Sequence, residues 1–149
     1  MKIYCDLDGV LVQQTGRDGF DQMPWMTDGK ELWEYVKQFH PTILSQLSPD
    51  IYDRGRVQKR IWCDRELGCD VPLIVARAWY YETAKYVYAQ SNAVLIDDHE
   101  EQHAAPWRKR GGVFIHHEDA RMTILKLKAV IHRDWIATIG YPVSGVVAT

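Results

Sequence analysis

The chain has 149 residues, 46% of them hydrophobic and 26% charged, and a formal net charge of −2. This composition is ordinary for a folded globular domain and excludes a disordered chain. The small net charge excludes an overall field that attracts nucleic acid or anionic lipid, so any phosphate binding must come from a local group of residues.

Five short, mostly apolar runs have the length and composition of buried strands. They are Lys2 to Leu7, Thr42 to Ser45, Pro72 to Ala76, Ala93 to Ile96 and Val113 to His116. Parallel strands buried on both faces are expected to be continuously apolar in this way.

The segments between these runs have helical spacing. A helix capped by Asp28 carries the stripe Leu32, Tyr35, Val36 and Phe39. Another spans Asp53 to Leu67, with Val57, Ile61 and Leu67 along one side, and shorter ones span Tyr80 to Gln90 and Glu100 to Arg110. The last opens at Thr123, with Ile124, Leu127 and Ile131 inward. Strands that alternate with helices predict an α/β fold, a Rossmann-like three-layer sandwich with a five-stranded parallel sheet. We expect one domain over residues 1–149.

Acidic and hydroxyl side chains follow the predicted strands at the edge where such sheets bind ligands. Asp6 and Asp8 come after the first strand, Ser45 ends the second, and Asp97 and Asp98 follow the fourth. Side chains at alternate positions of an extended segment point the same way, so Asp6 and Asp8 share a site. Clustered carboxylates repel one another unless a cation joins them, and Mg²⁺ prefers such oxygen ligands. The acids therefore predict a magnesium site.

Two motifs resemble those of a known family. The stretch Ile3-Tyr4-Cys5-Asp6-Leu7-Asp8-Gly9-Val10-Leu11 resembles the strand and DxDGV motif of haloacid dehalogenase superfamily phosphatases, and Leu95-Ile96-Asp97-Asp98 resembles their acidic fourth motif. The resemblance implies that Asp6 is the nucleophile and Asp8 the acid and base. It also implies that Asp6, the Asp8 carbonyl and Asp97 hold Mg²⁺, with Asp98 in an outer position.

The acid at position 8 narrows the reaction. Members of this superfamily that dehalogenate, cleave phosphonates or transfer phosphoryl groups often lack it, so its presence favours hydrolysis of a phosphomonoester. A carboxylate nucleophile divides one difficult displacement into two easier ones, and a neighbouring acid and base serves the leaving group and then the water.

The remaining phosphate contacts follow from the same resemblance. Ser45 matches the hydroxyl of the second motif, and two lysines compete for the third. Lys59 opens Lys-Arg-Ile-Trp-Cys-Asp-Arg-Glu-Leu-Gly, which resembles a helix of the 5′(3′)-deoxyribonucleotidase branch, and Lys85 resembles a lysine that this branch carries before its fourth motif. We rank Lys59 first and keep Lys85 as a second phosphate or loop contact.

The space for a cap over the site is small, because only residues 10–27 precede the first helix. A short flap leaves the site open and favours a nucleotide or a nucleic-acid end as the substrate. Phe20 and Trp25 lie in this flap, where they either stack on a base or pack the flap itself. The alternative substrate is a sugar phosphate or another small metabolite. A receiver-like signalling domain is the rival of another class, although its acceptor acid would follow the third strand, which here ends at Arg77.

Other residues set the cellular context. Cys5, Cys63 and Cys69 form no CxxC pair, which predicts a reducing, cytoplasmic location. No apolar run approaches the roughly 20 residues of a membrane span, so we expect no membrane partner.

His99 and His103 are four apart, but complementary zinc ligands are missing, and both histidines are expected at the surface. The oligomeric state has no signal in the sequence.

Overall fold

Five parallel strands form the middle layer of the protein. In a computed structural model, which describes residues 1–14 and 16–140, the spatial order of the strands is β3-β2-β1-β4-β5. The strands are β1 (Lys2–Cys5), β2 (Thr42–Leu47), β3 (Leu73–Arg77), β4 (Ala93–Asp97) and β5 (Val113–His116). The predicted α/β fold with a five-stranded parallel sheet is confirmed.

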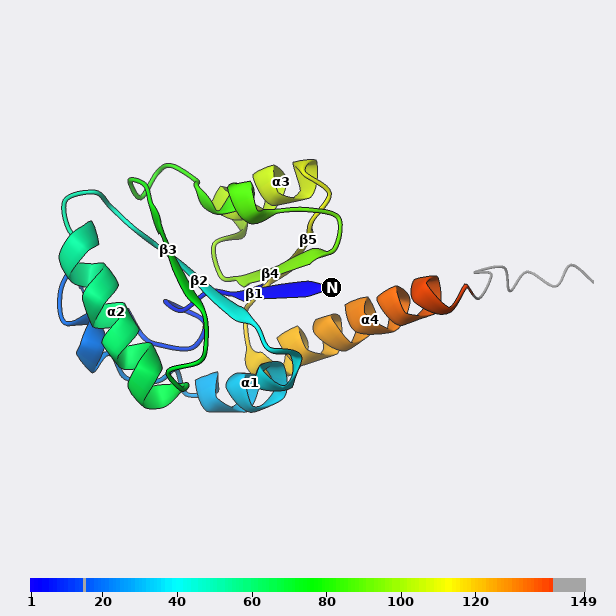
Figure 1. The fold of residues 1–149 in the computed structure, drawn as a ribbon, viewed down its shortest axis with the longest axis horizontal. Helices are drawn as coiled ribbons and strands as arrows, with labels where there is room; N and C mark the ends of the chain where they lie inside the picture. Colours follow the sequence, from blue (N-terminus) through cyan, green and yellow to red (C-terminus); the bar gives the residue numbers. More distant parts are fainter. Residues whose placement is uncertain (15, 141–149) are drawn as a thin grey trace, which may run out of the picture.

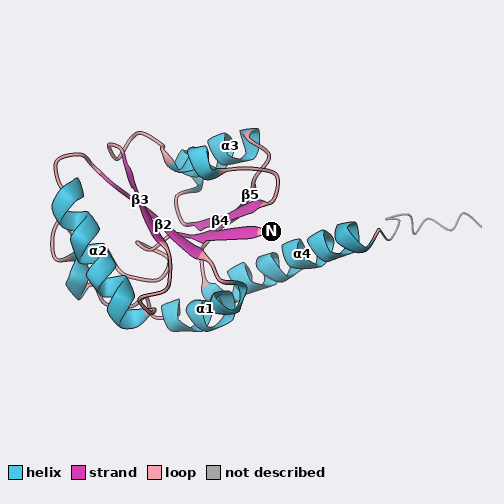
Figure 2. Cartoon of the chain, in the orientation of Figure 1, coloured by secondary structure: helices cyan, strands magenta, loops and turns pink. Residues whose placement is uncertain are grey.

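Helices cover both faces of this sheet (Figures 1 and 2). Three α-helices pack on one face, namely α1 (Gly29–Val36), α2 (Tyr52–Glu66) and α4 (Ala120–Ile139). The other face is covered by α3 (Glu100–Lys109) and by the 3₁₀ helix η3 (Lys85–Tyr88). The sheet and its two helical layers make the expected three-layer sandwich.

The strands supply both cores because successive side chains point to opposite faces. Ile96 of β4 is buried with Trp62 of α2 in the larger core, whereas its neighbour Leu95 is buried with Trp107 of α3 in the smaller one. Residues buried on both faces explain why the strands read as continuous apolar runs instead of alternating patterns.

The position of β1 at the centre of the sheet determines where the chain can build a site. After β1 the chain adds β2 and β3 on one side, and then crosses to add β4 and β5 on the other. The order of the strands therefore reverses between β1 and β4. In sheets of this kind a crevice forms beyond the carboxyl ends of the strands at such a point.

One helical prediction is wrong, and a second helix buries a different side from the one its apolar residues occupy. Val57 and Ile61 of α2 are 52% and 47% exposed, and the inward side of this helix carries Lys59 and Trp62 instead. The buried side of α2 contains the charged residue Lys59, so the distribution of apolar residues along the helix does not identify its buried side. The predicted helix from Tyr80 to Gln90 is a loop followed by the single 3₁₀ turn η3.

Helix starts also differ from the sequence pattern. Asp28 precedes α1, but its Oδ2 accepts a hydrogen bond from the backbone N–H of Ala120 at the start of α4 instead of capping its own helix. The final helix begins at Ala120, three residues before the predicted Thr123, because Asp119 caps it by accepting from the N–H of Met122. Asp28 thus ties the beginnings of two helices together.

Residues 10–27 form the short segment expected between the first two motifs. Its only regular element among the described residues is the 3₁₀ helix η1 (Phe20–Gln22), which packs against α2. None of the described helices combines the length and the hydropathy that crossing a membrane requires.

Candidate functional site

Three carboxylates meet at the crevice between β1 and β4. Asp6 follows β1 directly, Asp97 is the last residue of β4, and Asp98 comes next. Oxygen atoms of the three side chains all lie within 4.8 Å of one another. Asp6 and Asp97 are buried, whereas the side chain of Asp98 is 26% exposed. The switch point thus collects three acids in a space that suits a single cation.

One buried lysine lies among these acids. The Nζ of Lys85 donates hydrogen bonds to Asp6 Oδ1 at 2.9 Å and to Asp97 Oδ2 at 2.6 Å. Lys85 belongs to η3 and is 2% exposed, so its charge is held in place by the acids alone. Burial opposes that charge, yet Asp6 and Asp97 raise the pKa of Lys85, which keeps the ammonium protonated.

A single ammonium does not neutralise the acids. Burial, the charge of Asp97 and that of Asp8 raise the pKa of Asp6 to about 6 against the opposing effect of Lys85. Burial and the charges of Asp6 and Asp97 raise the pKa of Asp98 to about 8. The Oδ1 atom of Asp98 is buried and has no hydrogen-bond partner among the described residues. The donor set therefore lacks positive charge, and an oxygen-binding divalent cation fits it.

A second lysine organises the opposite side of the crevice. The Nζ of Lys59, on the inward face of α2, donates to Ser45 Oγ at 2.6 Å and also to Asp8 Oδ2. Ser45 Oγ donates in turn to the same Asp8 oxygen at 3.1 Å. Both Lys59 and Ser45 are completely buried. Asp8, two residues after Asp6, thus has its own ammonium and hydroxyl partners.

Gly9 makes the close approach of these segments feasible. Its φ of +77° is a left-handed conformation, and a Cβ built there would lie 2.1 Å from Asp98 Oδ2. Only glycine adopts such a conformation without strain and leaves the acid its space. The glycine of the first motif is therefore required both by the backbone and by the neighbouring carboxylate.

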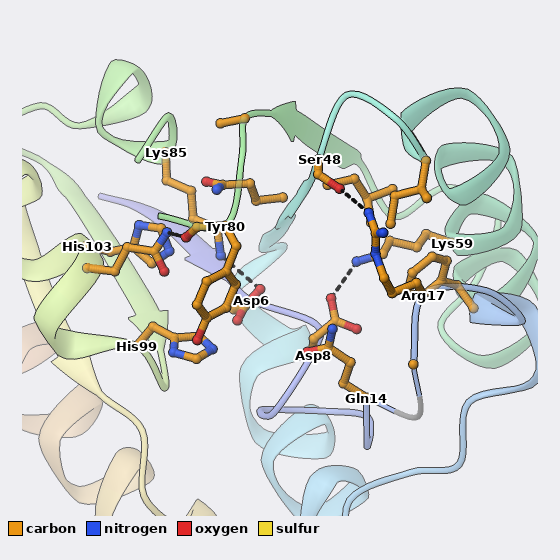
Figure 3. A pocket seen from close by; sticks show the side chains of 17 residues that line it. Asp6, Asp8, Gln14, Arg17, Ser48, Lys59, Tyr80, Lys85, His99 and His103 are labelled. Carbon is orange, nitrogen blue, oxygen red and sulfur yellow. Dashed lines mark hydrogen bonds and ion pairs between the residues drawn. The ribbon is translucent and has the colours of Figure 1, made fainter. Parts of the chain in front are cut away.

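The crevice opens into a pocket of about 330 Å³ (Figure 3). Figure 3 shows Asp6 and Asp8 at the centre. One wall includes Tyr80, Lys85, His99 and His103, and the opposite wall includes Arg17 and Lys59. The lining combines these charged groups with the apolar side chains of Phe20, Leu47 and Ile51, so the pocket offers both polar and apolar contacts.

The structure brings together all the predicted site residues, with some changes of detail. Ser45 does not end its strand, because β2 continues to Leu47. Asp98 lies in the acid cluster with Asp6 and Asp97, and the carboxylate of Asp8 lies outside that cluster, with Lys59. Lys85, ranked second, contacts the expected nucleophile directly, whereas Lys59 contacts the expected acid and base.

The two flap aromatics pack instead of offering a free platform. Phe20 is 2% exposed and lies under the Nζ of Lys59, 4.9 Å from its ring centroid. Trp25 packs at a tilt of 58° against the ring of Trp62 and donates its ring N–H to Glu66. The flap lines the pocket with two polar side chains, Gln14 and Arg17, besides Gly16 and Phe20.

Sequence reasoning missed two wall residues and misplaced one of them. His103 is 4% exposed, not at the surface, and its Nδ1 pairs with the hydroxyl of Thr83 at 2.9 Å. Tyr80, 74% exposed, lines the pocket from the loop after β3. That loop follows the carboxyl end of a strand, which was the signal available for Tyr80; no motif marks His103.

The chain matches no protein-family model, and no curated protein matches it.

Proposed function

We propose that this protein is a Mg²⁺-dependent phosphomonoester hydrolase that acts through an aspartyl-phosphate on Asp6, on a nucleotide or a nucleic-acid end. One observation carries the proposal: Asp6 and Asp8 lie at one crevice but have separate lysine partners, Lys85 and Lys59. Two carboxylates in different environments can perform different tasks, one as a nucleophile and the other as an acid and base.

The acid cluster fits magnesium. Asp6 and Asp97, with Asp98 beside them and the main chain at Asp8, would hold the ion. Bound Mg²⁺ offsets the charge of the incoming phosphate and orients it. Lys85 already contacts two of these acids, so it limits how much of their charge remains for the metal.

In the first half of the proposed reaction the Asp6 carboxylate attacks phosphorus. A bond forms from Asp6 to phosphorus, the ester P–O bond breaks, and the leaving oxygen takes a proton from Asp8. In the second half Asp8 removes a proton from water as that water attacks phosphorus. The Asp6–phosphorus bond breaks and orthophosphate leaves, so both acids return to their starting state.

Lys59 and Ser45 link substrate binding to the role of Asp8. In the free protein both groups bind the Asp8 carboxylate. A phosphate that takes them as partners withdraws their charge and hydrogen bond from Asp8. The Asp8 carboxyl group is then available to the leaving oxygen and, later, to the water.

The residues of the pocket wall favour a nucleotide as the substrate and leave one alternative substrate class. Tyr80 offers an exposed aromatic ring, which suits stacking with a base. The polar flap side chains Gln14 and Arg17 instead favour hydrogen bonding to hydroxyl groups, so a sugar phosphate is the second candidate. A receiver-like role has less support, because the end of β3 carries Arg77 and the acids follow β1 and β4.

A substrate panel tests the proposal. Purified protein is expected to release phosphate from nucleoside monophosphates with Mg²⁺ and to stop when the metal is chelated. Asp6→Asn should reduce turnover by about 10³-fold or more, because it removes the nucleophile. Asp134→Asn, on the far half of α4, is the matched control and should keep full activity.

Two results would count against this function. Full turnover by Asp6→Asn would show that another group attacks phosphorus. Equal rates with sugar phosphates and nucleotides would leave the hydrolase chemistry in place and remove the preference for a base.

A further inference from the structure

A second hollow lies beside the catalytic pocket, at the open edge of β3. We call it the Tyr52 groove; it has a volume of about 540 Å³ and lies between α2, β3 and Tyr88 of η3. Ile51 lines the catalytic pocket and the next residue, Tyr52, lines the groove. The Tyr52 ring also contacts Arg77, whose neighbour Ala78 lines the pocket. The two hollows are therefore neighbours along two chain segments.

Two arginines give the entrance of the groove a positive charge. The guanidinium carbons of Arg56 and Arg77 lie 5.8 and 5.6 Å from the centroid of the Tyr52 ring. Both side chains are exposed, and among the described residues neither forms an ion pair. Arg54 and Arg60 on the same helix do, with Asp18 and Asp64. The unneutralised charge is thus concentrated at Tyr52.

The rest of the groove is apolar and aromatic. Val57 and Ile61 of α2 are about half exposed there, and Leu73 and Val75 of β3 are only partly buried. Val57 and Ile61 lie on the exposed side of α2. Figure 2 shows α2 on the side of the sheet where β3 is the last strand, so none of the described strands covers this edge.

Cations beside flat apolar and aromatic surfaces are the features that bind single-stranded nucleic acid. Phosphates pair with guanidinium groups, and bases stack on the rings and apolar side chains beside them. The terminal phosphate of such a strand would enter the crevice at Asp6, and the adjoining nucleotides would lie across Tyr52. A mononucleotide has no second phosphate to reach Arg56 and Arg77.

We propose that the Tyr52 groove binds the nucleotides next to the terminal phosphate of a single-stranded nucleic acid, so that the substrate is an oligonucleotide end. The hydrolysis of that phosphate rests on the proposed function, but the binding does not. Binding and hydrolysis are therefore measured separately.

The binding test uses fluorescence anisotropy with a short oligothymidylate that carries a terminal phosphate, at the 5′ end in one probe and at the 3′ end in another. The double variant Arg56→Ser, Arg77→Ser should weaken binding about tenfold or more. It should also lower the slope of log affinity against log salt by about 1.4, since each single-strand phosphate contact contributes about 0.7. Arg110→Ser is the control, because Arg110 lies 5.8 Å from the Tyr86 ring and lines neither hollow.

The kinetic test compares the phosphorylated oligothymidylate with thymidine monophosphate. The double variant should lose kcat/KM for the oligonucleotide about tenfold through KM and keep its activity on the mononucleotide. Unchanged binding and unchanged oligonucleotide kinetics in the double variant would overturn the groove assignment. Equally tight, arginine-dependent binding of a glutamate-rich peptide would overturn the choice of nucleic acid.

The two proposals can fail independently. If no phosphate ester is hydrolysed but the oligonucleotide still binds through Arg56 and Arg77, the catalytic proposal fails and the groove stands. If mononucleotides are hydrolysed but the wild-type protein binds the oligonucleotide no better than the double variant does, the groove proposal fails and the catalytic one stands.

Discussion

The two sides of the crevice differ in charge although each contains a buried lysine. On the β4 side, the carboxylates of Asp6, Asp97 and Asp98 lie together and Lys85 contacts the first two, which leaves a charge of −2 when three acids and one ammonium are ionised. On the β2 side, Asp8 faces Lys59, and the charge is zero.

Under the proposed function, this difference gives each side a separate task. An excess of two negative charges matches one divalent cation, whereas a neutral pair can accept or release a proton without binding a metal. Burial makes the difference larger, because unbalanced charge costs more free energy in the interior than near water.

Removing the carboxylate of the neutral side should have the largest effect. Asp8→Asn is expected to lower turnover of an alkyl phosphate by about 10²–10⁴-fold, since the leaving oxygen and the water lose their acid and base. An ester with an acidic leaving group, such as p-nitrophenyl phosphate, should still phosphorylate Asp6, and the phosphoenzyme should accumulate in acid-quenched samples. Equal losses for both esters, with no accumulation, would contradict the role of Asp8.

Replacing each lysine in turn tests the charge difference between the two sides directly. Lys85→Met leaves three acids without a cation and should lower the free energy of unfolding by about 3–5 kcal/mol. Lys59→Met leaves only Asp8, whose side chain is 16% exposed, and should cost less. Urea denaturation with and without Mg²⁺ measures both. Added Mg²⁺ should restore stability to Lys85→Met much more than to Lys59→Met, and equal recovery would contradict the charge difference.

A pH titration sharpens the description of the β4 side. Burial and the charge of Lys85 lower the pKa of His103 to about 4, against the opposite effect of Asp6. The unfolded chain binds this proton near its ordinary pKa of about 6.5, so the stabilisation is complete above that pH and is lost as pH falls toward 4. His103→Gln should remove at most about 3 kcal/mol of this pH dependence. Denaturation at pH 7 and pH 4.5 compares the two proteins, and parallel losses would place the dependence elsewhere.

The smallest effect is expected where the two sides share the loop after β1. Gly9→Ala introduces a Cβ beside Asp98 and an unfavourable φ, and should cost about 1–3 kcal/mol. Because the new methyl group displaces Asp98, Mg²⁺ should stabilise the variant less than it stabilises the wild type. The shift in Tm on adding Mg²⁺ measures this, and Gly19→Ala is the control, with a similar φ of +73° and open space around it.

The sheet and the site could be predicted because their signals are local. Buried parallel strands are apolar runs, and the acids at the ends of β1 and β4 are adjacent to those runs in sequence. The same topology that covers both faces of the sheet brings the carboxyl ends together. The strand β5 was predicted to the residue for this reason.

The remaining features depend on tertiary packing. The inward side of α2 contains Lys59, which is stable there only because Asp8 and Ser45 lie opposite, and no spacing rule describes that. The choice between Lys59 and Lys85 likewise required coordinates, since both lysines reach the crevice and divide its acids between them. The side-chain amide of Gln46 donates hydrogen bonds to the carbonyl oxygens of Trp79 and Glu82 in the loop before Lys85. These contacts, between residues far apart in sequence, hold the loop where a helix was predicted.

The central place of β1 sets the order in which a newly made chain can complete its site. The neutral side needs β1, β2 and the first part of α2, all of which precede residue 60. The β4 side needs Lys85 and β4, which the ribosome adds later. Asp6 therefore waits for partners about 80–90 residues away, a separation of the kind that slows folding. During synthesis the chain would pair Asp8 with Lys59 first and complete the cluster of Asp6, Asp97 and Asp98 last.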